Sequence, residues 1–384
     1  MADPDSKARA GESGRGRDAS APQEVPAAGW KDILWRTWGE ISNDRVTLIA
    51  AGVTYYLLLA LFPALTAFVS LYGLFTEPAT VQEHVNMLST IVPAGGMEII
   101  SEQLQRLTSN GGSTLGLALF ISLALALWSA SSGVKSLFEA MNVAYDERET
   151  RNFFVLNGLA LGFTLGGVIA AVVMIGIVVI LPAIVGFLPI PGGLDWLVQV
   201  VGYLLLVAVL FVGIAALYRF GPSRQQAKWR WVTPGAVVAV VVIGIVSILF
   251  SWYTANFGNY DATYGSLGAL IGLLTWMWIT VTIVIVGGEL NSEAEHQTHK
   301  DSTVGTDDPL GQRNATMADT VGKSTDEGGD AAGDPNTESD DYKAGYKAAA
   351  QRYKPAPRRL SAGSLAFAVP AALAVRAMRR REPK

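Results

Sequence analysis

The chain has 384 residues, of which 50% are hydrophobic and 16% are charged, and its formal net charge at pH 7 is −4. It contains no cysteine, which excludes a disulfide framework, a thiolate metal site and a cysteine nucleophile. The apolar residues are concentrated between positions 46 and 290, and this concentration is typical of a membrane-embedded core flanked by polar tails.

Residues 1–29 are polar, and we expect them to form a disordered cytoplasmic tail. About 45 polar residues precede the first apolar run, whereas a cleaved signal peptide has a short basic start and a short apolar core. The first apolar run is therefore predicted to stay in the mature protein as a membrane span.

Residues 30–295 contain six stretches without any Asp, Glu, Lys, Arg or His, each holding the roughly 20 apolar residues that a spanning helix needs. In hydrocarbon every backbone amide must be satisfied within the segment, so runs of this length can only be helices. We therefore predict an all-α fold, a polytopic membrane helix bundle. Its six transmembrane helices are placed at about 46–75, 115–134, 154–181, 196–218, 232–253 and 266–288.

Residues 77–113, between the first two spans, place apolar side chains at helical spacing on both sides of a Pro-Ala-Gly-Gly break at 93–96. This pattern predicts an outer segment of two short amphipathic helices. The first, third and fifth connections between spans hold one Lys or Arg in total, whereas the second holds three and the fourth holds four. Under the positive-inside rule both termini are cytoplasmic.

Residues 296–359 are predicted to form an acidic disordered linker, because positions 293–341 hold 13 acidic and 3 basic residues. Residues 360–384 are basic and weakly apolar, within a stretch, 342–384, that holds 11 basic residues and 1 acidic residue. We expect residues 360–375 to lie along the membrane interface, with a seventh span as the alternative. Membrane lipids are the expected partners, and the basic end either contacts anionic lipid or stays a solvated tail.

Candidate functional residues are polar or helix-kinking positions within the apolar runs or at their ends: Tyr55, Tyr56, Pro63, Arg219, Tyr264, Glu289 and Asn291. Ionisable groups at membrane depth are often functional, and a proline inside a span can open a hinge or line a cavity. The alternatives are a purely structural bend, local hydrogen bonds of the hydroxyl groups, and placement of Glu289 at the interface where it reaches water.

Two further expectations concern how the helices pack. Glu289 is expected to form an ion pair with a cation of the same membrane face, namely Lys135, Arg151 or Arg219. Glycines also recur every four residues in the third span, at Gly158, Gly162 and Gly166. That spacing predicts a face through which helix backbones approach each other closely.

Catalytic patterns are missing from the sequence. No cluster of histidines and carboxylates is placed to hold a catalytic metal, and no Gly-rich loop is followed by the Lys and Ser/Thr that would hold a phosphate. We therefore expect no cofactor and no enzymatic activity.

Several motifs occur in a recognisable order. Residues 51–63 read Ala-Gly-Val-Thr-Tyr-Tyr-Leu-Leu-Leu-Ala-Leu-Phe-Pro, residues 231–236 read Trp-Val-Thr-Pro-Gly-Ala, residues 264–269 read Tyr-Gly-Ser-Leu-Gly-Ala and residues 288–291 read Gly-Glu-Leu-Asn. In this order they resemble the YihY/BrkB family (virulence factor BrkB-like, UPF0761-type) of bacterial inner-membrane proteins. The resemblance implies a six-span, multi-pass protein of the bacterial plasma membrane. Virulence-factor and transport labels coexist in that family with an older ribonuclease name.

We predict a permease-like protein that moves a small solute, an ion or a lipid. The alternative is a non-transporting scaffold or envelope-maintenance factor whose tails recruit partners. A ribonuclease is disfavoured, and no nucleic-acid partner is expected, because hydrolysis of RNA by a metallonuclease requires clustered His and Asp ligands and a basic groove for phosphates. No residue pattern specifies a substrate or an oligomeric state.

Overall fold

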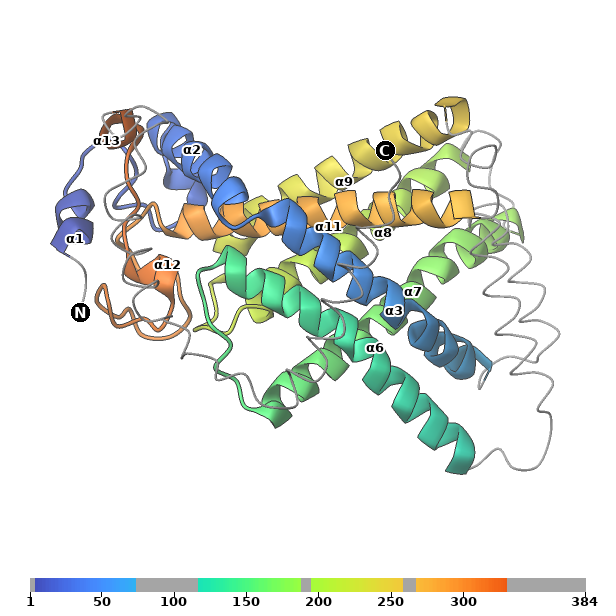
Figure 1. The fold of residues 1–384 in the computed structure, drawn as a ribbon. Coiled ribbons are helices and arrows are strands. Elements are labelled where there is room, and N and C mark those ends of the chain that lie inside the picture. Colours follow the sequence, from blue (N-terminus) through green and yellow to red (C-terminus); the bar gives the residue numbers. More distant parts are fainter. Residues whose placement is uncertain (1–3, 74–116, 188–194, 258–266, 330–384) are drawn as a thin grey trace, which may run out of the picture. The chain divides into compact units, whose positions relative to one another are not determined.

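The computed structural model describes residues 4–73, 117–187, 195–257 and 267–329 (Figure 1). Residues 1–325 form one compact unit and residues 326–384 form a second, and the contacts discussed below all lie within the first. In chain order the elements are α1 (Pro4–Ala10), η1 (Pro22–Glu24), α2 (Ala27–Asn43), α3 (Val46–Gly73), α6 (Leu117–Ala144), α7 (Phe153–Phe187), α8 (Asp195–Phe220), α9 (Trp229–Phe257), α11 (Leu267–Glu295), α12 (Thr316–Asp319) and α13 (Thr325–Gly329).

Every regular element in the described ranges is a helix, apart from one isolated β-bridge between Ala227 and Thr303. The all-α fold is thereby confirmed. Four of the predicted spans coincide within a few residues with helices α7, α8, α9 and α11.

Among the described residues four helices are long and apolar enough to cross a membrane, and counting the bent pair of α2 and α3 as one span gives five. The four lie at Phe153–Ile177, Val200–Phe220, Trp229–Thr254 and Leu270–Glu295. Helix α6 covers the second predicted span but is not one of these five within the described residues. It carries Lys135 and Glu139 in its second half.

Helix α2 was not expected from the sequence. It precedes the first span and meets the first part of α3 at an angle of 63°. The turn between them contains Arg45, whose backbone φ of 52° lies in the left-handed region. A residue in that region cannot continue a right-handed helix, so the chain changes direction there.

Helix α11 is the central element of the bundle, because it contacts α2, α3, α6, α9 and α12 (orange in Figure 1). The best-packed core lies at the end of the bundle where α3, α7 and α9 begin and α6, α8 and α11 end, which we call the basic end. Its large buried side chains are Phe138, Met141, Tyr145, Tyr218, Trp231 and Ile285. Farther along the helices, large side chains such as Tyr203 and Ile248 are 68% and 72% exposed, as expected of a surface that faces lipid.

Residues 4–26 and 296–325 pack on each other, and we call these two segments the cap. The hydroxyl of Thr298 donates between the backbone carbonyl oxygens of Arg17 and Ala19, at 2.9 and 2.7 Å. The Arg17 side chain is fully buried. Burial lowers its pKa, and the hydrogen bond and charge of Glu12 partly offset that effect.

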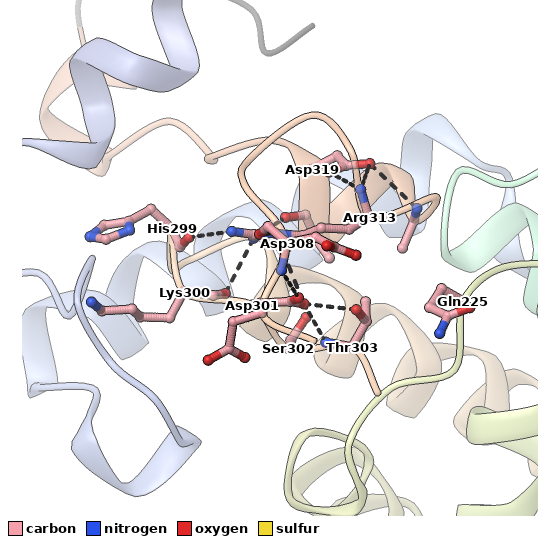
Figure 2. A network of polar contacts seen from close by, with 12 residues as sticks. Gln225, His299, Lys300, Asp301, Ser302, Thr303, Asp308, Arg313 and Asp319 are labelled. Carbon is pink, nitrogen blue, oxygen red and sulfur yellow. Dashed lines mark hydrogen bonds and ion pairs between the residues drawn. The ribbon is translucent and has the colours of Figure 1, made fainter. Parts of the chain in front are cut away.

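A second arginine organises the C-terminal part of the cap (Figure 2). The guanidinium of Arg313 donates to the backbone carbonyl oxygens of His299 (2.7 Å), Lys300 (3.3 Å), Asp308 (3.0 Å) and Ala318 (2.6 Å). A single side chain thereby fixes four points of an otherwise irregular segment. Charge-assisted hydrogen bonds of this kind are the strong ones in proteins.

The composition of the tail, 1–29, and the linker, 296–359, predicted disorder. In the structure the described parts of both have a defined backbone and buried side chains. Composition does not reveal that Arg17 and Arg313 are buried, because their burial depends on carbonyl groups brought together by folding. The predicted outer segment 77–113 and the predicted interfacial residues 360–375 lie outside the described residues.

Candidate functional site at the basic end of the bundle

Helices α9 and α11 touch backbone to backbone at Gly235 and Gly287. A Cβ atom on Gly235 would lie 2.0 Å from the carbonyl oxygen of Gly287, and one on Gly287 would lie 2.9 Å from the carbonyl oxygen of Gly235. Neither position has room for a side chain without movement of a backbone. This contact is the close approach through small residues that stabilises helix pairs in membranes.

Two hydrogen bonds of Asn291 stabilise the same contact. Its Oδ1 accepts a hydrogen bond of 2.7 Å from the backbone N–H of Gly235, and its Nδ2 donates one of 3.0 Å to the carbonyl oxygen of Val232. Between these two residues lies Pro234, which has no N–H to donate. The fully buried amide of Asn291 therefore satisfies α9 backbone groups around a helix-breaking residue.

Tyr218, on α8, joins a third helix to this contact. Its hydroxyl donates to the carbonyl oxygen of Val284 on α11 at 2.7 Å, and its ring is buried. The same hydroxyl would lie 2.3 Å from a Cβ atom on Gly287. The sequence pointed to the neighbouring Arg219 and missed Tyr218 as a candidate.

Glu289 is buried, with 1% of the residue exposed. Among the described residues its Oε1 atom has no hydrogen-bond partner. The carboxyl of Asp44, at the bend between α2 and α3, lies nearby, so Glu289 is buried close to a second acidic side chain.

The expected ion pair of Glu289 is not present in the described residues, and that prediction is wrong. Lys135 instead donates to Asn157 Oδ1 at 3.1 Å, and Arg151 pairs with Glu149 at 2.5 Å. The reason is local, because both cations find acceptors on α7 or just before it.

Arg219, near the end of α8, also has no carboxylate partner in the described part of the chain. It donates from Nη1 to the carbonyl oxygen of Ala227 at 2.9 Å, and its guanidinium lies over the Trp229 ring at 4.5 Å from the centroid. Its Nε atom is buried without a hydrogen-bond partner. This cation is thus held by two aromatic rings, since it also lies 5.5 Å from the centroid of the Phe220 ring, and by one backbone carbonyl.

The remaining candidates that the structure describes are not gathered at the basic end. Tyr55 and Tyr56 are 58% and 51% exposed on α3, with their rings 5.8 Å apart in an edge-on arrangement. Pro63 lies inside α3, which continues past it to Gly73. Tyr264 lies outside the described residues.

A cavity of about 900 Å³ opens at the basic end beside the start of α7 and the end of α8. Its lining includes three arginines, Arg151, Arg219 and Arg224, and two acidic residues, Glu147 and Asp319. Both carboxylates accept backbone N–H groups, Glu147 from Thr316 and Asp319 from Gly311 and Arg313. The cavity is therefore a polar chamber whose carboxylates are already used in holding the C-terminal segment.

Two of the cavity arginines have carboxylate partners. Arg224 donates from Nη2 to both carboxylate oxygens of Glu295 at 2.7 Å, and its guanidinium lies 4.7 Å from the centroid of the Tyr145 ring. Burial raises the pKa of Tyr145, so its phenol stays neutral. The sequence missed this ion pair, although Glu295 ends a helix whose last two turns carry three glutamates.

Arg151 and Glu149 form the second pair. Arg151 also donates to the carbonyl oxygens of Phe220 and Gly221, at 3.1 and 2.8 Å, and so ties the start of α7 to the end of α8. Burial alone would raise the pKa of Glu149. The hydrogen bonds and charge of Arg151, with a hydrogen bond from Asn142, outweigh burial and lower that pKa to about 2.

Metal ligands are not clustered in the described residues, where no group of three or more His, Cys, Asp or Glu side chains could hold a metal ion.

Comparison with known proteins places this arrangement in a family. The model of a family described as virulence factor BrkB matches residues 37–309. The chain belongs to the BrkB family. It is a multi-pass membrane protein of this bacterial family, and the match contains the α9–α11 contact, Glu289 and the three cavity arginines.

The relatives of this BrkB protein carry different names. A Bacillus subtilis (strain 168) protein named as ribonuclease-like, YfkH, is 32% identical over 259 residues, which is 63% of this chain and 88% of that protein. Two UPF0761 membrane proteins, XAC0937 of Xanthomonas axonopodis pv. citri and XCV0968 of Xanthomonas euvesicatoria pv. vesicatoria, are 29% identical over 262 residues. The matches cover 66% of this chain and 59% of each Xanthomonas protein. No solved structure matches.

Proposed function

We propose that this BrkB protein is a permease-like protein that moves a small solute, an ion or a lipid across or within the bacterial plasma membrane. The proposal includes six spans with both termini in the cytoplasm, as the distribution of Lys and Arg in the connections favours. The basic end then faces the cytoplasm, where the positive residues 342–384 would also meet anionic lipid.

One observation carries the proposal. Arg219 and Glu289 lie at the ends of apolar helices, and in the described residues neither has a partner of opposite charge. An ionisable group at membrane depth costs free energy, so a protein that needed only stability would replace it with an apolar residue or pair it. Unpaired groups of both signs at one end of a bundle favour a role in binding or moving a charged species.

The second candidate is a scaffold or envelope-maintenance factor that transports nothing. The cap favours it, because a folded surface built from residues 4–26 and 296–325 offers other proteins more to bind than disordered segments would. The family match ends at residue 309, so the last part of the cap, residues 310–325, lies outside it.

We also propose that the protein is not a nuclease, although one relative is named as ribonuclease-like. A metallonuclease holds its ions with clustered His and Asp side chains. The described residues offer no such group.

Flux through liposomes containing the purified full-length protein tests the proposal, with ions, osmolytes and fluorescent lipids screened in turn. We expect transport of at least one compound to fall in both the Glu289→Gln and the Arg219→Gln variants. Glu139→Gln and Arg148→Gln are the matched controls, because both residues are exposed at the same end of the bundle, and they should behave as wild type.

A truncation separates the two candidates. A chain that ends at residue 295 lacks residues 296–325, the C-terminal segment of the cap, and everything that follows, and its amount in the membrane is compared with that of the full chain. If a cellular function of the protein were lost on this truncation and unchanged by Glu289→Gln and Arg219→Gln, the scaffold would replace the permease as the better account.

A further inference from the structure

A groove runs along the bundle between α7 and α8. It has a volume of about 770 Å³ and an almost wholly apolar lining. Four glycines of α7 and one of α8 line it, and a Cβ atom added to any of them would meet no described residue within 4 Å: Gly158, Gly162, Gly166, Gly167 and Gly213. Among the described residues Gly158, Gly162 and Gly166 therefore do not bring the backbones of α7 and α8 together, as their spacing had predicted, but line an open groove.

The groove adjoins the polar cavity at the basic end, which we call the chamber. Leu159 and Phe220 line both spaces, so the apolar groove ends beside the arginine-lined chamber. From Gly158 to Ala170 the groove follows α7 for 13 residues, and the 12 rises between them, of 1.5 Å each, give a length of about 18 Å. That length is close to one leaflet, which is about half of a hydrocarbon core of about 30 Å.

The chamber has spare capacity for an anion. Arg219 has no carboxylate partner in the described part of the chain and keeps a buried, unpaired Nε. Arg224 has a side chain that is only 1% exposed, and its Nη1 is likewise unpaired among the described residues although Nη2 is bound to Glu295. Buried guanidinium N–H groups without acceptors are costly, and a phosphate oxygen is the acceptor that suits them best.

We propose that the groove and chamber together bind an anionic phospholipid. Its phosphate lies beside Arg219 and Arg224, and one acyl chain lies along the glycines of α7. The inference deepens the proposed function, on which it rests, by naming a lipid as the class of molecule that the site receives.

A helix of a second copy is the other object that could fill an apolar groove in a membrane. Such a helix would cover the glycines but bring no anion to the arginines, since it would be apolar over this length. The charge at one end and the apolar channel at the other complement an amphiphile with an anionic head.

Binding of a fluorescent-tailed phosphatidylglycerol to the delipidated full-length protein in detergent micelles tests the inference. Three competitors are added in parallel: unlabelled phosphatidylglycerol, phosphatidylcholine and soluble glycerol 3-phosphate. We expect phosphatidylglycerol to displace the probe at a concentration at least about fivefold lower than phosphatidylcholine. Glycerol 3-phosphate should displace it poorly, because it has no chain for the groove.

Two variants test the binding of the lipid head group and of its acyl chain separately. Arg219→Gln should weaken phosphatidylglycerol about fivefold and leave phosphatidylcholine unchanged, whereas Gly162→Leu, which fills the groove, should weaken both. Arg148→Gln and Gly244→Leu are the matched controls. Arg148 is an exposed cation that does not line the chamber, and Gly244 is an open glycine on α9. If Gly162→Leu does not fold, the head-group preference of the wild type and the Arg219→Gln variant still decide the question.

Three results would overturn the inference. Equal displacement by the two phospholipids, unchanged in Arg219→Gln, would remove the anion site. Displacement by glycerol 3-phosphate as effective as by phosphatidylglycerol would assign the chamber to a soluble phosphate compound. If the wild type is dimeric and Gly162→Leu is monomeric, the groove binds a helix of a second copy and not a lipid. Lipid binding without any flux in liposomes would instead refute the permease and leave the lipid site standing.

Discussion

Two pairs of helices in this protein carry glycine on their facing surfaces, and they differ in what the glycines do. In the α9–α11 pair, Gly235 and Gly287 bring the two backbones into contact. In the α7–α8 pair, the glycines line an open groove in which an added Cβ atom would meet nothing.

The difference teaches that small residues permit a close approach but do not cause one. At the α9–α11 contact, polar side chains hold the helices together, because Asn291 and Tyr218 form hydrogen bonds with backbone groups of a neighbouring helix. Between α7 and α8 the described polar ties lie at the basic end alone, from Arg151 to the carbonyl oxygens of Phe220 and Gly221 and between Thr150 and Ser223. Without a hydrophobic drive between helices in lipid, the groove beyond that tie stays open.

The largest effect is expected from Gly235→Ala. The new methyl group would lie 2.0 Å from the Gly287 carbonyl oxygen, so the helices must separate, and overpacking of this kind costs about 3 kcal/mol. Unfolding by SDS titration in mixed micelles measures the change. Gly244→Ala, on the same helix with open space around it, serves as control, and an equal response from both variants would show that the contact is not closed.

Asn291→Ala is expected to cost about 2 kcal/mol, because it leaves the buried N–H of Gly235 without an acceptor. The same titration measures it. Asn256→Ala is a suitable control, since that amide is exposed and bonds within its own helix. A cost for Asn291→Ala no greater than that of the control would mean that shape alone holds α9 against α11.

Acidification should lower the stability of the protein at the junction of α7 and α8, because it protonates Glu149. The pKa of this carboxyl is lowered to about 2 from an unfolded value of about 4.3, so the stability that it contributes is present above the unfolded value. That stability is lost as the pH falls from about 5 towards 2. The expected contribution is about 1 kcal/mol after screening, because the group is partly exposed.

Thermal unfolding between pH 7 and pH 3 tests this expectation. Wild type should exceed Glu149→Gln in unfolding midpoint at pH 7, and the gap should narrow below pH 4.5. Glu139→Gln, at an exposed carboxyl of the same end, controls for general acid effects. A gap of constant size across the range would contradict the role given to the Glu149–Arg151 pair.

The positions of the apolar helices could be predicted from the sequence because hydropathy is a local property. The predicted span 154–181 lies within α7, and the predicted span 266–288 differs from the start of α11 by one residue. Which partner each polar side chain chooses could not be predicted, because that depends on segments distant in the chain. Glu289 lies near Asp44, which is at a bend between α2 and α3 that no local pattern predicted.

The order of the cap could not be predicted either, because it also depends on contacts between segments that are distant in the chain. Its segments are polar and rich in charge, which predicts disorder when each is considered alone. Arg36 of α2 joins them to the bundle by an ion pair with Glu293 and hydrogen bonds to Gln297 and to the carbonyl oxygen of Lys323. Such a buried network can be predicted only when the two segments of the cap, residues 4–26 and 296–325, are considered together with α2.

The smallest effect has the opposite sign. Gly162→Ala should stabilise the protein by about 0.5–1 kcal/mol, because alanine costs less backbone entropy than glycine inside a helix and its methyl group enters empty space. In the same SDS titration Gly235→Ala should destabilise the protein. The change in the free energy of unfolding caused by a Gly→Ala substitution therefore has opposite signs in the two helix pairs. A loss of stability in Gly162→Ala as large as in Gly235→Ala would show that α7 and α8 close on each other in the membrane, and the groove would not exist.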